Sequence, residues 1–225
     1  MEFAGMAEAY ARRHGHGGML RDRDFQGGAY PWHILSGESG AKIGPLDAPA
    51  SGEGTSAAFP SGAGHRRLHS GEPIMIDFGT VLNGYHCDET RMFAIGSLPA
   101  AARKACDAVI HIYQRVLEKV RPGVCGSNLF DHAVAVSESI GYGEAFLGPP
   151  GNKVSFIGHG IGTELIEPPF IARNRKALLV PGMTFALEPK MVFENRYGVG
   201  IESVIQVTET GHRPLTRQPL DPVIC

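Results

Sequence analysis

Isolated acidic side chains in apolar segments are the first candidates for chemistry. Asp77 lies in IDFG and Asp88 in YHCDETR, on either side of Asn83-Gly84. Asn-Gly is a strong signal for a two-residue hairpin turn. Such a hairpin places Asp77 opposite Thr90, so Asp77 and Asp88 share one face as diagonal neighbours, about 7–8 Å apart at the backbone. Because ionised side chains are costly among strand formers unless they are paired, this spacing predicts a metal ion between the two carboxylates.

A second acidic pair follows the same logic near the end of the chain. Glu188 lies in TFALEPKMVF and Glu202 in VGIESVIQV, and their midpoint is Asn195 in a polar turn. A hairpin about that turn places the two glutamates opposite each other, each as a lone acid in an apolar strand. His159 lies between the two hairpins, in FIGHGIG, where glycines let the backbone bend and expose the imidazole.

Four carboxylates and one imidazole suit two hard or borderline cations, such as Mn²⁺, Co²⁺, Fe²⁺ or Zn²⁺. Two ions about 3.5–4 Å apart can bridge a water, lower its pKa and polarise a carbonyl group. A single pair of aspartates is more often a turn or edge feature, and a lone GHG histidine is more often a core residue. Two separate hairpins that each pair acids on one face favour the metal site. The predicted ligands are Asp77, Asp88, His159, Glu188 and Glu202.

The elements that must position these residues follow from periodicity and turn signals. Helices are predicted at 1–13, 99–120 and 127–140, and strands around 74–78, 85–94, 155–157, 184–193 and 199–207. The first helix carries Phe3, Met6, Ala7 and Tyr10 near one face. The Gly-, Ser- and Pro-rich stretch from 14 to 71 is expected to form short strands and loops that shape a pocket. Clustered rather than alternating helices and strands favour an α+β fold with an antiparallel sheet.

Composition narrows the class of protein. The 225 residues suit one large domain or two small ones, and the formal charge of -2 comes without a basic block, so a surface for nucleic acid or an anionic membrane has no support. No apolar run approaches the ~20 residues of a membrane helix. The four cysteines are scattered without CxxC spacing, which favours a reduced, cytoplasmic chain.

The ordered series IDFG, GYHCDETR, GHGIG, LEP and GIES resembles the creatinase, methionine aminopeptidase and Xaa-Pro peptidase superfamily. GHGIGTELIEPP and GIES look most like the Xaa-Pro dipeptidase and aminopeptidase P branch. The resemblance implies a pita-bread fold, a homodimer and a single catalytic domain over 1–225, as a C-terminal fragment without the separate N-terminal domain of full-length relatives. It also implies that the five predicted residues bind two metal ions, with Asp88 and Glu202 bridging them.

The chain departs from these peptidases around the expected substrate site. Ile166 stands where a histidine normally binds the substrate carbonyl, and Pro60-Ser61 is the nearest match to a second proline-histidine pair. Gly200 stands where some aminopeptidase P relatives have an arginine, and roughly 41–56 is extra sequence. Isoleucine can neither donate a hydrogen bond nor carry a proton. The candidates to replace the missing imidazole are His33, His65, His69 and His86, the last of these more plausibly in a supporting role.

Three functions fit these observations. The first is a manganese- or similar metal-dependent peptidase for short peptides with proline second, in which Glu188 is the general base and remains a ligand. The second is another metal-dependent enzyme on the same scaffold, a lyase or non-peptide hydrolase, which the changes at Ile166, Ser61 and Gly200 motivate. The third is a binding module without catalysis, against which the complete ligand set argues.

Overall fold

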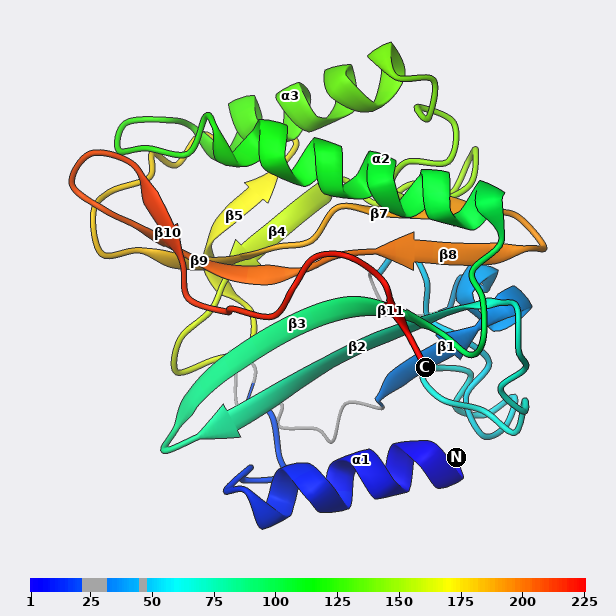
Figure 1. Ribbon diagram of the computed structural model, residues 1–225. Helices are drawn as coiled ribbons and strands as arrows, with labels where there is room; N and C mark the ends of the chain where they lie inside the picture. Colours follow the sequence, from blue (N-terminus) through cyan, green and yellow to red (C-terminus); the bar gives the residue numbers. More distant parts are fainter. Residues whose placement is uncertain (22–31, 45–47) are drawn as a thin grey trace.

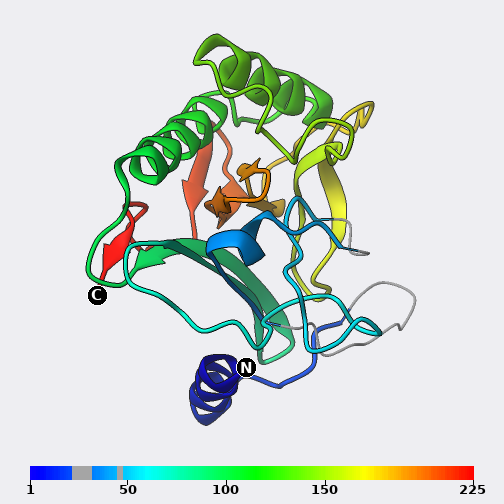
Figure 2. The same cartoon turned by 90° about the vertical axis from the view of Figure 1, so that its right-hand side faces the viewer.

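The computed structural model describes residues 1–21, 32–44 and 48–225. Helices α2 (Ala100–Leu117) and α3 (Gly126–Ser139) lie together on one side of the curved sheets, and α1 (Glu2–Arg13) lies on the other side (Figure 1). The view in Figure 2 shows the same three layers from the side. The described strands are β1 (His33–Ser36), β2 (Pro73–Leu82), β3 (Tyr85–Ala94), β4 (Phe156–Gly160), β5 (Glu167–Ala172), β6 (Thr184–Leu187), β7 (Lys190–Phe193), β8 (Tyr197–Gly200), β9 (Ser203–Val207), β10 (His212–Pro214) and β11 (Val223–Ile224). Apart from β11 on β3, the named strands pair antiparallel, as the α+β prediction requires.

The first predicted hairpin is confirmed residue by residue. Strands β2 and β3 pair with Asp77 opposite Thr90 and Leu82 opposite Tyr85. Asn83 and Gly84 both have positive φ, 53° and 83°, as a type I′ turn requires. Strand β1, one of the short strands expected within 14–71, pairs with β2 and brings His33 opposite Asp77.

The second hairpin has the predicted register, but its strands are not continuous as predicted: each is divided into two shorter strands. Leu187 pairs with Ser203 in β6–β9, and Lys190 pairs with Gly200 in β7–β8. Glu188 and Glu202 therefore lie opposite each other, but in the break between two ladders rather than inside strands. Pro189 has no N–H to give to a ladder, which accounts for the interruption. The break frees both glutamate side chains from the regular alternation of a strand.

The main hydrophobic core lies between the helix layer and the sheets. The predicted periodicity of the second helix holds for Ala105, Ala108, Ile112 and Val116, which are buried, whereas Ala101 is exposed. Phe130 of α3 and Phe185 of β6 are the largest side chains fully enclosed in this core, together with Phe146. Leu187 of β6, next to Glu188, belongs to this core, which anchors the segment that carries that acid.

Helix α1 packs through small side chains. Ala4 and Ala7 contact a minor core around Ile34 and Ile74, while Phe3, Met6 and Tyr10 are exposed. Of the four residues expected on one apolar face, only Ala7 is packed. Among the described residues, no helix has the length and apolar character that crossing a membrane requires.

Helix η2 (Gly37–Ala41), a short 3₁₀ helix, lies directly against β8. A Cβ on Gly198 would lie 2.2 Å from the carbonyl oxygen of Gly40, so this contact tolerates only glycine there. The close approach fixes the segment that follows β1 next to the second hairpin.

Candidate metal centre

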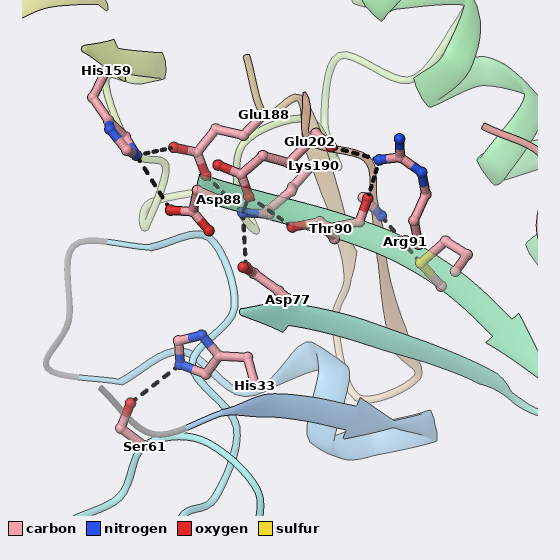
Figure 3. Close-up of polar contacts among 12 residues, drawn as sticks. His33, Ser61, Asp77, Asp88, Thr90, Arg91, His159, Glu188, Lys190 and Glu202 are labelled. Atoms are coloured by element: carbon pink, nitrogen blue, oxygen red, sulfur yellow. Dashed lines mark hydrogen bonds and ion pairs between the residues drawn. The ribbon is translucent and has the colours of Figure 1, made fainter. Parts of the chain in front are cut away.

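The five residues proposed as ligands gather in one region of the interior (Figure 3). Asp77 comes from β2, Asp88 from β3, and His159 from β4, while Glu188 and Glu202 come from the break between ladders. The His159 Nε2 atom lies 3.5 Å from Glu188 Oε1 and 3.8 Å from Asp88 Oδ2. Donor atoms of Asp88, His159 and Glu202 all lie within 4.8 Å of one another. The two hairpins thus bring their acids to the same place, around one imidazole.

His159 is oriented by its own backbone segment. Glycines flank it, and a Cβ on Gly158 would lie 2.3 Å from the carbonyl oxygen of Ala186, so β4 and β6 approach closely here. Nδ1 of His159 lies 3.1 Å from the carbonyl oxygen of Gly160. Donation from Nδ1 to that carbonyl leaves the Nε2 lone pair facing the carboxylates, which is the usual arrangement of a histidine that binds a metal.

A sixth charged residue, Lys190, lies within the cluster (Figure 3). Its Nζ donates to Glu188 Oε2 at 2.6 Å, lies 3.0 Å from Asp77 Oδ2, and lies 3.4 Å from Glu202 Oε2. Sequence reasoning missed this residue. The signal was available, because a lysine two residues after Glu188 in an otherwise apolar segment is the same kind of isolated charge as the acids.

The carboxylates do not share the negative charge equally. Burial, with the charge of Asp77 adding to it, raises the pKa of Asp88 to about 7. Burial and the charge of Asp88 raise the pKa of Glu202 well above its usual value. Burial also acts to raise the pKa of Asp77, but the positive charge of Lys190 and the hydrogen bonds from Lys190 and Thr90 outweigh it, and that pKa is lowered. When all four carboxylates are ionised, the one ammonium leaves three negative charges, so the ionised cluster favours additional positive charge.

Glu202 is held from two sides. Thr90 Oγ1 donates to Glu202 Oε2 at 2.8 Å, and Arg91 Nη1 donates to the Glu202 carbonyl oxygen at 2.5 Å. Glu202 Oε1 is buried, and among the residues that the structure describes it has no hydrogen-bond partner. A buried carboxylate oxygen without a partner is costly, which points to an occupant that the protein itself does not supply.

A cavity of about 280 Å³ opens beside this cluster. Its walls include Trp32 and Phe78, whose rings stack at 4.5 Å between centroids with an interplanar angle of 12°. Ile166 lines the cavity and is 38% exposed, so it faces the pocket instead of packing in the core. Ala48, from the extra segment, also lines the cavity, while 45–47 lie outside the described residues.

The four histidines that could replace the missing imidazole lie in different surroundings. His33 lines the cavity and its Nε2 lies 3.5 Å from Ser61 Oγ, at the position where the second histidine was expected (Figure 3). Burial lowers the pKa of His33, so its imidazole is neutral at pH 7 and can either donate or accept. His65 and His69 are exposed and do not line the cavity. His86 accepts a hydrogen bond from the Arg21 N–H at 3.0 Å and contacts the Gly162 carbonyl oxygen, which supports the loop after β4.

This fold and this cluster of acids define a class of metallopeptidase. The chain matches the model of metallopeptidase family M24 over residues 1–209, and it belongs to that family.

Sequence comparison shows which members of the family this chain is similar to. The chain is 31% identical over 165 residues to the Xaa-Pro dipeptidase of Pyrococcus furiosus, which covers 73% of this chain and 45% of that protein. It is 34% identical over 162 residues to the probable dipeptidase PepE of Mycobacterium bovis, which covers 71% of this chain and 41% of that protein. The chain thus spans less than half the length of these two relatives.

Solved structures agree with the sequence matches. The crystal structure of X-Pro aminopeptidase from Thermotoga maritima matches with a TM-score of 0.81 and 25% identity, over 100% of this chain and 55% of that one. Dipeptidase PepE from Mycobacterium ulcerans matches with a TM-score of 0.79 and 26% identity, over 98% of this chain and 51% of that one. The pita-bread fold and the Xaa-Pro branch expected from the motifs are confirmed.

Members of this family generally use divalent metals, and the residues present fit such an ion. The donors are carboxylates and an imidazole, the set that Mn²⁺, Co²⁺, Fe²⁺ and Zn²⁺ accept. Donor atoms around one ion at about 2.1 Å are at most about 4.2 Å apart, close to the spread of Asp88, His159 and Glu202. The unpartnered Glu202 Oε1 supplies a free donor atom in the same place.

Proposed function

We propose that this protein is a metal-dependent peptidase that cleaves short peptides with proline in the second position. The proposed ligand set is Asp77, Asp88, His159, Glu188 and Glu202. The observation that carries the proposal is the convergence of donors from two hairpins and β4 beside an apolar cavity. Manganese, cobalt, iron and zinc all suit these donors, and two ions, as the resemblance implies, remain a prediction.

An ion bound at this centre would polarise the scissile carbonyl group and acidify a water for attack. Glu188 would take the proton of that water, because its carboxylate lies at the cavity wall next to His159. His33 would hydrogen-bond the substrate carbonyl in place of the histidine that Ile166 replaces. It is a neutral imidazole on the same cavity wall.

The apolar side of the cavity suits a proline ring. Trp32 and Phe78 form a stacked aromatic surface, and Leu20, Leu165 and Ile166 extend it. A pyrrolidine ring has no N–H to satisfy once it is acylated, so it loses little when it leaves water for such a wall. The proposed selectivity for proline follows from this surface.

The test is turnover of a panel of Xaa-Pro and Xaa-Ala dipeptides and tripeptides by the manganese- or cobalt-loaded full-length protein. The Xaa-Pro members are expected to react faster. Absence of turnover on every peptide, with metal bound, would favour the lyase or non-peptide hydrolase alternative. In that case Ile166→His should also fail to create strong peptidase activity, whereas a robust gain from this substitution would speak against the alternative.

Replacing His33 by alanine is expected to lower kcat/KM for Xaa-Pro peptides by about 10²-fold. Metal binding should be unchanged, because the ring lies on the side of Asp77 away from His159 (Figure 3). Steady-state kinetics and metal titration measure the two effects. The control is His65→Ala, which changes an exposed histidine outside the cavity and should leave kinetics unchanged. Equal kinetics for His33→Ala and wild type would remove His33 from the proposal.

Two further expectations from the sequence stay predictions. A homodimer would appear as twice the monomer mass in light scattering. A cytoplasmic location would appear in fractionation of cells that express the full-length protein.

A further inference from the structure

We propose that the ammonium group of Lys190 takes the place of a second divalent ion, so that this centre binds one ion, held by Asp88, His159, Glu188 and Glu202. The inference rests on the proposed function only in assuming that the centre binds metal. It differs from the expectation of two ions, and it assigns Asp77 to Lys190 instead of to a metal.

The cluster has two ends, which share Glu188 and Glu202. His159 faces Asp88 and Glu188 Oε1 at one end, where the closest group of possible donors also includes Glu202. Lys190 Nζ lies at the other end, against Asp77 Oδ2 at 3.0 Å and the second oxygen of Glu188 at 2.6 Å (Figure 3). The Asp77 end thus already holds a positive group, the Lys190 ammonium, whereas the His159 end has donor atoms for one metal ion.

An ion at the Asp77 end would compete with the ammonium for the same oxygen atoms. A transition metal ion binds carboxylate oxygens at about 2.0–2.2 Å. Lys190 Nζ already lies within 3.0 Å of Asp77 Oδ2 and within 3.4 Å of Glu202 Oε2. A divalent ion bound to these two oxygens would lie almost in contact with a positive charge in a buried site, where repulsion is strong.

The net charge of the cluster also favours one bound ion. Carboxylates that bind a metal are deprotonated, so the four carboxylates of the metal-bound centre carry four negative charges in total. One divalent ion together with the ammonium leaves a single negative charge, whereas two ions together with the ammonium would leave a single positive charge in an interior built from acids. The ammonium therefore already supplies part of the compensation that a second ion would bring.

Lys190 cannot easily move aside. The residue is 3% exposed, and its stem crosses its partner in the β7–β8 ladder, Gly200. A Cβ on Gly200 would lie 2.6 Å from Lys190 Cγ and 3.2 Å from the sulfur of Met75. Gly200 thus provides the space that the lysine stem occupies, and the two residues form one structural unit. This gives the glycine at position 200 a physical reason that its sequence context alone did not supply.

The experiment is a metal count on the full chain. Protein stripped with chelator is titrated with Mn²⁺ by calorimetry, and the bound metal is measured by elemental analysis after dialysis. The wild type is expected to bind one ion per chain, with the electron paramagnetic resonance spectrum of an isolated Mn²⁺. Lys190→Ala, which removes the ammonium and opens its space, is expected to bind two ions with the spectrum of a coupled pair.

Two further variants keep the test decisive. Lys104→Ala, which removes an exposed lysine of α2, should still bind one ion. Asp77→Asn should also still bind one ion, because Asp77 contacts Lys190 and not the ion. This variant tests the assignment of Asp77 even if Lys190→Ala fails to fold.

The outcomes separate this inference from the proposed function. Two ions in the wild type, or one ion in folded Lys190→Ala, would overturn the inference and leave a metal-dependent peptidase intact. Loss of the single ion in Asp77→Asn would overturn the assignment of Asp77. No bound metal in the wild type would overturn the proposed function itself.

Discussion

Asp88→Asn is expected to make the metal-free protein more stable and, at the same time, to abolish metal-dependent turnover. The wild-type protein holds Asp88 in a buried cluster, where burial and the charge of Asp77 raise its pKa to about 7. Asparagine has nearly the same shape but no charge, so it removes a repulsion that only a bound cation would otherwise relieve. The same change removes a proposed ligand that the first hairpin contributes.

The direction of the pH dependence follows from that shift. The folded-state pKa of Asp88, about 7, lies above the ordinary value of 3.8, so the folded protein binds this proton more tightly than the unfolded chain. The stability of the metal-free wild type should therefore fall as the pH rises from about 4 to about 7. The gain from Asp88→Asn should be largest above pH 7 and should vanish below about pH 4.

Thermal unfolding of the metal-free proteins between pH 4.5 and pH 8, with and without added Mn²⁺, measures these effects. Added metal is expected to stabilise the wild type and not the variant, and turnover should drop by about 10³-fold or more when the ion is lost. Asp131→Asn, which changes an exposed aspartate of α3, is the control and should match the wild type. An Asp88→Asn protein that still responds to metal and turns over peptide would exclude Asp88 as a ligand.

Arg91→Met is expected to cost about 3–5 kcal/mol of unfolding free energy, the range for leaving buried partners of a charged group unpaired. The guanidinium is 7% exposed and holds three parts of the chain together. It donates to the carbonyl oxygens of Thr90 and Glu202 and to Ser203 Oγ. It also donates to the carbonyl oxygens of Gln218 and Pro219 near the C-terminus. Methionine fills part of the volume but removes all of these donated hydrogen bonds and the ion pair with Glu89.

Urea denaturation measures the loss, and metal titration measures a second effect. Because Arg91 fixes the backbone of Glu202, we expect metal affinity to fall by about 10–100-fold in the variant. Arg103→Met is the matched control. Among the described residues, Arg103 pairs with exposed acids of α2 and the C-terminal segment, and such pairs contribute about 1 kcal/mol or less. Similar stability losses for the two variants would mean that the buried hydrogen bonds of Arg91 contribute no more than a surface ion pair.

The amino-acid sequence by itself determined the first hairpin and the composition of the cluster. Asn83-Gly84 sets a two-residue turn, and the period of two along a strand then places Asp77 and Asp88 on one face, so short-range geometry was sufficient. The symmetry about Asn195 likewise gave the correct facing of Glu188 and Glu202. It could not show that Pro189 breaks the ladder between them, because continuity of pairing depends on which strands each half joins.

Only the tertiary structure decided what surrounds the acids. His33 comes next to Asp77 because β1 pairs with β2 across the intervening segment 37–72, and no local pattern distinguished it from His65 or His69. Lys190 reaches Asp77, more than 100 residues earlier in the chain, because the two hairpins pack against each other. Local alternation placed each pair of acids on a face, but the positive group that shares their charge was set by contacts between distant segments, which sequence spacing does not encode.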